Sequence, residues 1–192
     1  MKFSIRNILI SLTILSVGCG KQQPTDNRLT AAWQIVDTDP YTVFEILDSI
    51  PTGGLATADD SALYNLLYIE ALHNVGLYTK SDSMIAASER FYRQSKQMDK
   101  LVRAYLQHGI SFYNTRKYLR AVQYLKDAEL MARNLPDNYL QFSIQTMLGQ
   151  TNAAANCKEI ALKHFKRSLS IDDPRITVDA RAQCLSRIAS LY

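Results

Sequence analysis

The chain has 192 residues and a net charge of +4, from 22 lysines and arginines against 18 aspartates and glutamates. This excess is too small for a protein recruited to nucleic acid mainly by phosphate charge. The hydrophobic fraction of 47% is enough to form a core, which argues against wholesale disorder. Only seven glycines and five prolines are present, without alternating β-branched runs, so the composition disfavours a β-sandwich or β-barrel. Three cysteines are too few for a disulfide framework.

The N-terminus has the organisation of an export signal. Lys2 and Arg6 give it a basic start, and Ile8 to Val17 then form an apolar run of ten residues. A helix of this length spans only about 15 Å, roughly half of a bilayer core, so the run is too short to cross a membrane. The pattern predicts a secretory signal peptide over residues 1–18.

The exit from the apolar run is Ser16-Val17-Gly18-Cys19, which resembles the lipobox of bacterial lipoproteins. The resemblance implies cleavage before Cys19 and multiple acylation of this cysteine, which would anchor the mature chain in a membrane. One feature departs from the usual pattern, because Ser16 stands where leucine is usual and Leu15 lies one position earlier. The alternative is an ordinary signal peptide in which Cys19 has no role. Gly20 replaces the aspartate that retains such proteins at the inner membrane, so we expect an outer-membrane location facing the periplasm or the cell surface.

Residues 19–28 are polar and contain Pro24, and they predict a short tether in front of a helical domain over residues 29–192. Asp39 before Pro40 is typical of an N-cap followed by a first-turn proline. Thr57 with Asp60 three positions later resembles a capping box. The helices expected in this first part of the chain are Ala31–Val36, Pro40–Ile50 and Ser61–His73.

Small and large residues recur at a spacing of forty in the second half of the chain. The series are Gly109, Gly149 and Ala189; Phe112, Asn152 and Tyr192; Ala121 and Ala161; and Leu125 and Phe165. An earlier unit is expected 34 residues before Ala121 and Leu125, at Ala87 and Phe91. Such a period predicts stacked pairs of antiparallel helices, which approach closely where glycine or alanine meets a bulky side chain.

The best unit extends from Tyr105 to Ala128 and resembles the tetratricopeptide repeat, with His108 where leucine is usual. The resemblance implies an all-α fold, namely a right-handed α-solenoid of helix hairpins with an incomplete last repeat. Because this family repeats about every 34 residues, we expect the extra residues to lie around Asn134–Tyr139 and Ser170–Thr177.

The stretch Asp39–Tyr68 is similar to the start of lipid-anchored tetratricopeptide proteins of Bacteroidetes. Some members of that group continue into a membrane span and a coiled coil or DNA-binding domain, and act as sensors or regulators. The sequence shows neither continuation, so the resemblance implies at most a sensing part of a regulatory system.

No residue pattern in the chain predicts catalysis. His73, His108 and His164 are never spaced as paired metal ligands, and no phosphate-binding loop or nucleophile motif is present. We therefore expect no enzyme activity, no metal and no cofactor, with His108 in a helix–helix contact. Asp59-Asp60 and Asp172-Asp173 are interpreted as helix caps rather than a catalytic pair.

Cys157 and Cys184 are expected to remain unbonded despite an oxidising compartment. In the repeat geometry Cys157 begins one helix and Cys184 lies early in the antiparallel helix that follows it. This places them at opposite ends of a layer, beyond the roughly 7 Å Cα separation that a disulfide allows.

The remaining candidate for function is a surface. In tetratricopeptide arrays the first helix of each unit lines a concave groove that takes extended peptides or partner helices. The residues that this resemblance places in the groove are Arg103, Leu106, Gln107, Ile110, Tyr113, Asn114, Thr146, Met147, Gln150, Ala153, Gln183 and Arg187. Arg103 and Tyr113 are the expected anchors for a protein ligand, and the alternative is that these side chains merely face solvent.

The leading interpretation is a non-enzymatic, lipid-anchored adaptor that binds an unidentified protein or peptide and no nucleic acid. Accessory roles in outer-membrane assembly or in glycan uptake are the alternatives. Near the C-terminus an apolar stripe of Leu185, Ile188, Ala189 and Tyr192 has no second helix to cover it. It predicts either a truncated member of a longer family or a homodimer formed through the last helix.

Overall fold

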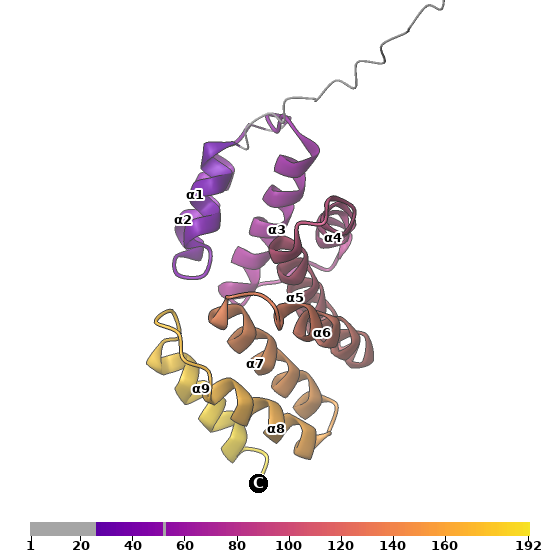
Figure 1. Cartoon of the computed structure of the whole chain (residues 1–192), viewed down its shortest axis with the longest axis vertical. Coiled ribbons are helices and arrows are strands. Elements are labelled where there is room, and N and C mark those ends of the chain that lie inside the picture. Colours follow the sequence, from indigo (N-terminus) through magenta and orange to yellow (C-terminus); the bar gives the residue numbers. More distant parts are fainter. Residues whose placement is uncertain (1–25, 52) are drawn as a thin grey trace, which may run out of the picture.

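A computed structural model describes residues 26–51 and 53–192. This part of the chain contains nine α-helices and no β-strand (Figure 1). The helices are α1 (Asn27–Ile35), α2 (Pro40–Asp48), α3 (Ala58–Asn74), α4 (Ser83–Ser95), α5 (Met98–Asn114), α6 (Tyr118–Ala132), α7 (Asn138–Ala154), α8 (Lys158–Leu169) and α9 (Val178–Ala189). The expectation of an all-α protein is confirmed over these residues. The predicted signal peptide and Cys19 lie outside them.

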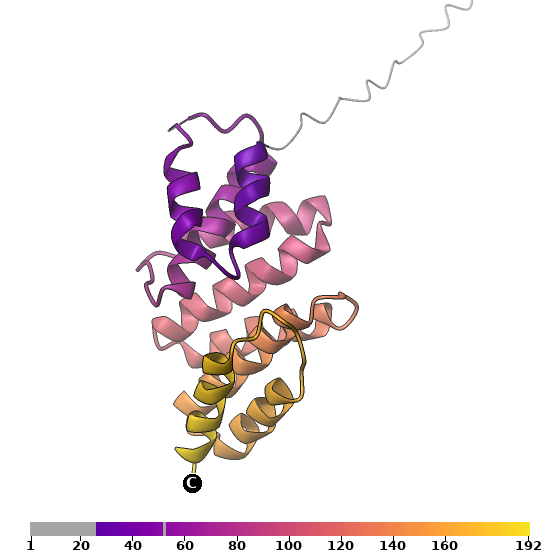
Figure 2. The ribbon, with the colours of Figure 1, turned by 90° about the vertical axis from the view of Figure 1, so that its left-hand side faces the viewer.

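Consecutive helices pack against each other along the long axis of the molecule, from α1 and α2 at one end to α8 and α9 at the other (Figures 1 and 2). The firmest pairs are α3 with α4, α5 with α6, and α7 with α8. The first helices of these pairs also contact one another, α3 with α5 and α5 with α7. Four buried apolar clusters follow the same order along the stack. The architecture is therefore a linear, repeat-like series of helix pairs.

The first helices repeat with a period of forty residues. Helices α3, α5 and α7 are each 17 residues long, and they begin at residues 58, 98 and 138. Helix α9 begins at residue 178, so it occupies the corresponding position after α8. The sequence pattern indicated this period for the second half of the chain, and the structure extends it back to α3.

The repeat includes the way each of these helices ends. Gly76, Arg116 and Asn156 lie forty residues apart and have left-handed backbones with φ of 77°, 59° and 61°. In each case the next amide donates to a carbonyl five residues earlier, with N–O distances of 2.8–2.9 Å. This is the Schellman motif, which satisfies carbonyl groups that a helix end leaves unpaired. Helices α3, α5 and α7 therefore end in the same way at equal spacing.

Small residues bring the paired helices together, as the sequence predicted. A Cβ atom built on Gly109 would lie 2.8 Å from the Leu125 side chain, and one built on Gly149 would lie 2.6 Å from the Phe165 ring. Both distances are below van der Waals contact, so a larger residue at either crossing would force the facing side chain to move. Gly109 and Gly149 also occupy the same position of their helices, because α5 and α7 begin forty residues apart.

The prediction for the earlier unit is wrong by one residue. Ala87 is exposed, whereas Ser88 and Tyr92 are fully buried and occupy the core positions of α4. The shift arises because residues 75–82 form a longer connection between α3 and α4 than the three-residue connections at 115–117 and 155–157. The extra residues of the forty-residue period thus lie in different loops in different units, including the two predicted loops around Pro136 and Pro174.

Several predicted boundaries also differ slightly from the structure. Helix α1 begins at Asn27, inside the segment predicted to be a tether, because Asp26 caps it by accepting from the Arg28 amide. Helix α2 ends at Asp48, two residues earlier than predicted, while Asp39 is its N-cap as expected. Thr57 is likewise the N-cap of α3, accepting from the Asp60 amide at 2.9 Å.

Candidate functional site

The molecule contains a partly buried ionic cluster where the α1–α2 loop approaches the loop between α8 and α9. Arg103, on α5, is 94% buried, because its relative exposure is 6%. Its guanidinium donates to both carboxylate oxygens of Asp37 at 2.8 Å and to Glu70 of α3 at 2.7 Å. A longer contact of 3.4 Å reaches Asp137, the N-cap of α7. Arg103 therefore links the α1–α2 loop with α3, α5 and α7.

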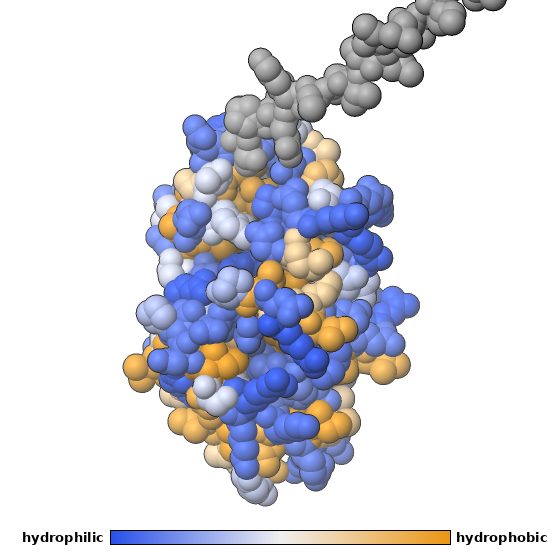
Figure 3. Space-filling view, viewed as in Figure 1, coloured by the Kyte–Doolittle hydropathy of each residue, from blue (hydrophilic) through white to orange (hydrophobic). Residues whose placement is uncertain are grey.

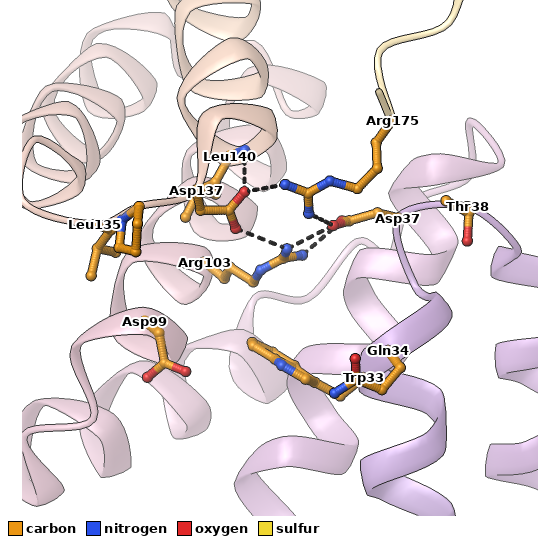
Figure 4. Close-up of a pocket in the computed structure, with 11 residues that line it drawn as sticks. Trp33, Gln34, Asp37, Thr38, Asp99, Arg103, Leu135, Asp137, Leu140 and Arg175 are labelled. Atoms are coloured by element: carbon orange, nitrogen blue, oxygen red, sulfur yellow. Dashed lines mark hydrogen bonds and ion pairs between the residues drawn. The ribbon is translucent and has the colours of Figure 1, made fainter. Parts of the chain in front are cut away.

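A second arginine completes this cluster from the opposite end of the chain. Arg175, in the loop between α8 and α9, donates to Asp37 at 3.0 Å and to Asp137 at 2.7 Å. It also makes a bidentate pair with Asp173. We call Asp37, Arg103, Asp137 and Arg175 the ionic cluster. Figure 4 shows the two guanidinium groups between the carboxylates of Asp37 and Asp137.

Two aromatic rings support the arginines. The Arg103 guanidinium lies 5.0 Å from the centre of the Trp33 ring, and that of Arg175 lies 4.9 Å from the centre of the Tyr139 ring. These distances are within the range of cation–π attraction. The hydroxyl of Tyr139 also lies 3.5 Å from the backbone carbonyl of Asp37.

Burial and neighbouring charges shift the pKa values of this region. Burial raises the pKa of Glu70 to about 7, although the positive charge of Arg103 opposes this effect. Burial by itself lowers the pKa of Arg103, but the charges of Glu70 and Asp37 raise it overall, so this arginine stays charged. Hydrogen bonds from Arg175 lower the pKa of Asp173 to about 2. Glu70 is therefore the member of this region that titrates near neutral pH.

Beside the cluster lies a pocket of about 300 Å³, which we call the Trp33 pocket (Figure 4). Its lining residues are Trp33, Gln34, Asp37, Thr38, Asp99, Arg103, Leu135, Pro136, Asp137, Leu140 and Arg175. Trp33 comes from α1 and Asp99 comes from α5. Figure 4 marks no interaction between Asp99 and the other residues that it draws. On the face seen in Figure 3, hydrophilic side chains cover much of the surface with smaller hydrophobic patches between them.

A smaller pocket of about 50 Å³, the Glu70 pocket, is also lined by Arg103. Its lining residues are Asp37, Glu70, Asn74, Arg103, Leu106, Gln107, Ile110, Tyr139, Leu140 and Ser143. Asp37, Arg103 and Leu140 line both pockets, so the two are neighbours. We refer to the two pockets together as the groove.

The structure brings together only part of the predicted binding surface. Arg103, Leu106, Gln107 and Ile110 do line one pocket, but the first three are buried. The prediction of Arg103 as a free anchor for a ligand is wrong, because Asp37, Glu70 and Asp137 already bind its guanidinium. The residues outside both pockets are half-buried Tyr113, Asn114, Thr146, Met147, Gln150 and Ala153, and exposed Gln183 and Arg187.

Sequence reasoning missed most of the groups that surround Arg103. Asp37 and Arg175 are 138 residues apart, so no local pattern relates them. Trp33 is the only tryptophan in the chain, which is the one feature that singles it out in the sequence. Glu70 lies among apolar residues of its helix, and a carboxylate in such a position is expected to be buried only with a partner. No prediction from the sequence used this observation.

The three histidines each hydrogen-bond a different side chain. His73 Nδ1 lies 2.7 Å from Gln107 Oε1, His108 Nδ1 lies 2.7 Å from Glu89 Oε2, and His164 Nδ1 lies 2.8 Å from Gln145 Oε1. The expectation that His108 lies in a helix–helix contact is confirmed, since its relative exposure is 4%. Within residues 26–51 and 53–192, no three histidines, cysteines or acids are grouped as metal ligands.

The predictions for the cysteines and for the apolar stripe on the last helix agree with the structure in part. Cys157 and Cys184 are both free, as predicted, and Cys184 is buried against Thr146 and Ser168. In the stripe on α9, Leu185 is 56% exposed, while Ile188 packs on the core. None of the helices among the residues described is both long enough and apolar enough to cross a membrane.

Comparisons with known proteins give no relative of this chain. No family model, no curated protein and no solved structure matches it. Its function is therefore inferred from its own residues.

Proposed function

We propose that this protein is a lipid-anchored periplasmic adaptor, without enzyme activity, that binds a protein or peptide in the groove of a tetratricopeptide-like array. The observation that carries the proposal is the repetition of α3, α5 and α7 at a period of forty residues with equivalent ends. Stacked helix pairs of this kind create extended surfaces that are used for binding.

The groove supplies the kind of surface that a polypeptide ligand uses. Trp33 and Tyr139 provide aromatic rings, Leu135 and Leu140 provide apolar contact, and Asp99 provides an exposed charge. Aromatic and charged groups around a concave site favour recognition of a protein segment. The ionic cluster holds these groups in place, because it connects the loops that flank them.

The anchor is the second part of the proposal. Acylation of Cys19 would attach the chain to a membrane, with residues 20–25 between the lipid and α1. Replacing Cys19 with alanine is expected to move the protein from the membrane fraction to the soluble periplasmic fraction, and loss of metabolic fatty-acid labelling would accompany this change. Retention in the membrane with undiminished labelling would contradict the anchor.

Crosslinking in intact membranes tests the binding proposal. A photoreactive residue at Gln34, which is exposed and lines the Trp33 pocket, is expected to form adducts with a partner protein. The matched control is the same residue at Lys166, which is exposed on α8 outside the groove. Adducts from position 34 but not from position 166 support the proposal, and the same pattern from both positions, or none from position 34, overturns it.

A further inference from the structure

The groove carries more acid than base although the chain as a whole is basic. Four carboxylates line it, at Asp37, Glu70, Asp99 and Asp137, against the two guanidinium groups of Arg103 and Arg175. Asp173 adds a further carboxylate behind Arg175. The net charge of the chain is +4, so this negative excess is local. A bound group of positive charge would complement it.

One oxygen of the groove lacks a partner, which is a separate observation. Glu70 is only 3% exposed, and its Oε1 accepts from Arg103 at 2.7 Å. Its Oε2 is buried and has no hydrogen-bond partner among the residues described. The nearby Asn74 amide is already used, because it donates to the carbonyl of Val36 at 2.8 Å. A buried carboxylate oxygen without a donor is unfavourable, and a ligand that brings a charged N–H group would relieve this.

The shape of the Glu70 pocket selects among cations. The pocket is small, at about 50 Å³, and offers one unpartnered carboxylate oxygen, which suits the compact point charge of an ammonium better than a planar guanidinium that pairs with two oxygens. Leu106, Ile110 and Leu140 line the same pocket, so they offer apolar contact to an alkyl stem. A lysine side chain combines such a stem with an ammonium group at its end.

We propose that the groove binds a lysine-bearing segment of its partner protein, with one lysine ammonium donating to Glu70 and the segment passing Asp99 and Trp33. This inference rests on the proposed adaptor function and names the chemistry of the partner. Asp99 is exposed and lies in the larger pocket, where it attracts a second basic side chain of the segment.

Trp33 provides a direct readout, because it is the only tryptophan and it lines the groove. The probe is hexalysine, titrated into the full-length protein in detergent micelles while the fluorescence of Trp33 is followed. We expect saturable binding that weakens as salt is raised. Hexalysine acetylated on every side chain, which has the same length without the charge, is expected not to bind, and hexaarginine is expected to bind at least about tenfold more weakly.

Variants locate the contact. Glu70→Gln is expected to weaken hexalysine binding at least about tenfold, and Asp99→Asn, at an exposed position, about threefold. The control is Glu129→Gln, since Glu129 is also buried but lies outside both pockets. If Glu70→Gln fails to fold, Asp99→Asn and the acetylated peptide decide the question in folded protein. Equal affinity of wild type and Asp99→Asn together with binding of the acetylated peptide, or unchanged affinity of a folded Glu70→Gln protein, overturns the inference.

The experiments distinguish an error in this inference from an error in the proposed adaptor function. Crosslinking from Gln34 to a partner, without hexalysine binding, removes the lysine chemistry and leaves the adaptor. Absence of crosslinking from Gln34 in membranes removes both.

Discussion

Asp37 and Arg175 are separated by 138 residues and lie 3.0 Å apart, so the loop after the first helix contacts the loop before the last (Figures 1 and 2). In a simple helical repeat each unit contacts only its neighbours. Here the α1–α2 loop also meets the loop between α8 and α9 through the ionic cluster. This contact bounds the groove and buries Arg103 within it.

The Asp37–Arg175 contact is expected to hold both loops in place. Arg175→Gln removes the ion pairs with Asp37, Asp137 and Asp173, and because the Arg175 side chain is 33% exposed, the cost in stability is about 1 kcal/mol. Amide hydrogen exchange is then expected to accelerate about fivefold in residues 36–39 and 171–177 together. Arg187→Gln is the control, since Arg187 is exposed on α9. Faster exchange in only one of the two loops would contradict a contact that joins them.

Arg103 is expected to be the most sensitive charged residue. Arg103→Met leaves the carboxylates of Asp37 and Glu70 without their buried partner, so the free energy of unfolding falls by roughly 3–5 kcal/mol. Chemical denaturation measures this loss. Arg93→Met is the comparison, because Arg93 is 59% exposed and its pair with Glu89 is worth less than about 1 kcal/mol.

A double substitution tests whether the loss comes from uncompensated charge. Adding Glu70→Gln to Arg103→Met removes one of the stranded carboxylates, so part of the stability is expected to return. A double variant less stable than Arg103→Met would show that Glu70 stabilises the fold by another route.

Glu70 is expected to make stability depend on pH. Burial raises its folded-state pKa to about 7; the charge of Arg103 opposes this shift and that of Asp37 adds to it. Tyr139 and the His73–Gln107 pair are the other groups near this pocket. The folded protein therefore binds more protons than the unfolded chain between the ordinary carboxyl pKa and about 7. Stability from this group is highest at acid pH and falls as pH rises through this window, by at most about 1.4 kcal/mol per pH unit.

Thermal melts of wild type and Glu70→Gln between pH 5 and 8 measure this effect. The difference in melting temperature between the two proteins is expected to change across the window, because glutamine does not titrate. A constant difference at every pH would exclude Glu70 as the titrating group. Burial lowers the pKa of His73, and because this histidine is present in both proteins, its own titration contributes to both sets of melts.

The two glycine crossings are expected to differ in tolerance. A Cβ at Gly149 meets the Phe165 ring at 2.6 Å, whereas one at Gly109 meets the more adaptable Leu125 side chain at 2.8 Å. Gly149→Ala is therefore expected to destabilise by about 1–3 kcal/mol, and Gly109→Ala by less, since the Leu125 side chain can change rotamer more easily than the Phe165 ring can move. Combining Gly149→Ala with Phe165→Leu should recover part of the loss. Equal stability of Gly149→Ala and wild type would mean that the helices separate freely.

The helix pairs were largely predictable because their determinants are local. Glycine opposite a bulky residue sets how closely α5 approaches α6, and the caps Asp39 and Thr57 act within a few residues of their own position. Such signals are readable without knowing the tertiary structure. The register of α4 was missed because the length of the loop 75–82 has no side-chain pattern of its own.

The candidate site was less predictable because it depends on distant residues. The repeat pattern singled out Arg103 on α5, but only the folded chain brings Asp37, Glu70 and Asp137 to it. What the amino-acid sequence determined by itself is the helical period of the second half of the chain and the close crossings, since each depends on a few residues at regular spacing. What the tertiary structure decided is which charges meet: the curvature of the stack brings loops 138 residues apart into contact, and burial there turns a predicted ligand anchor into an internal support of the groove.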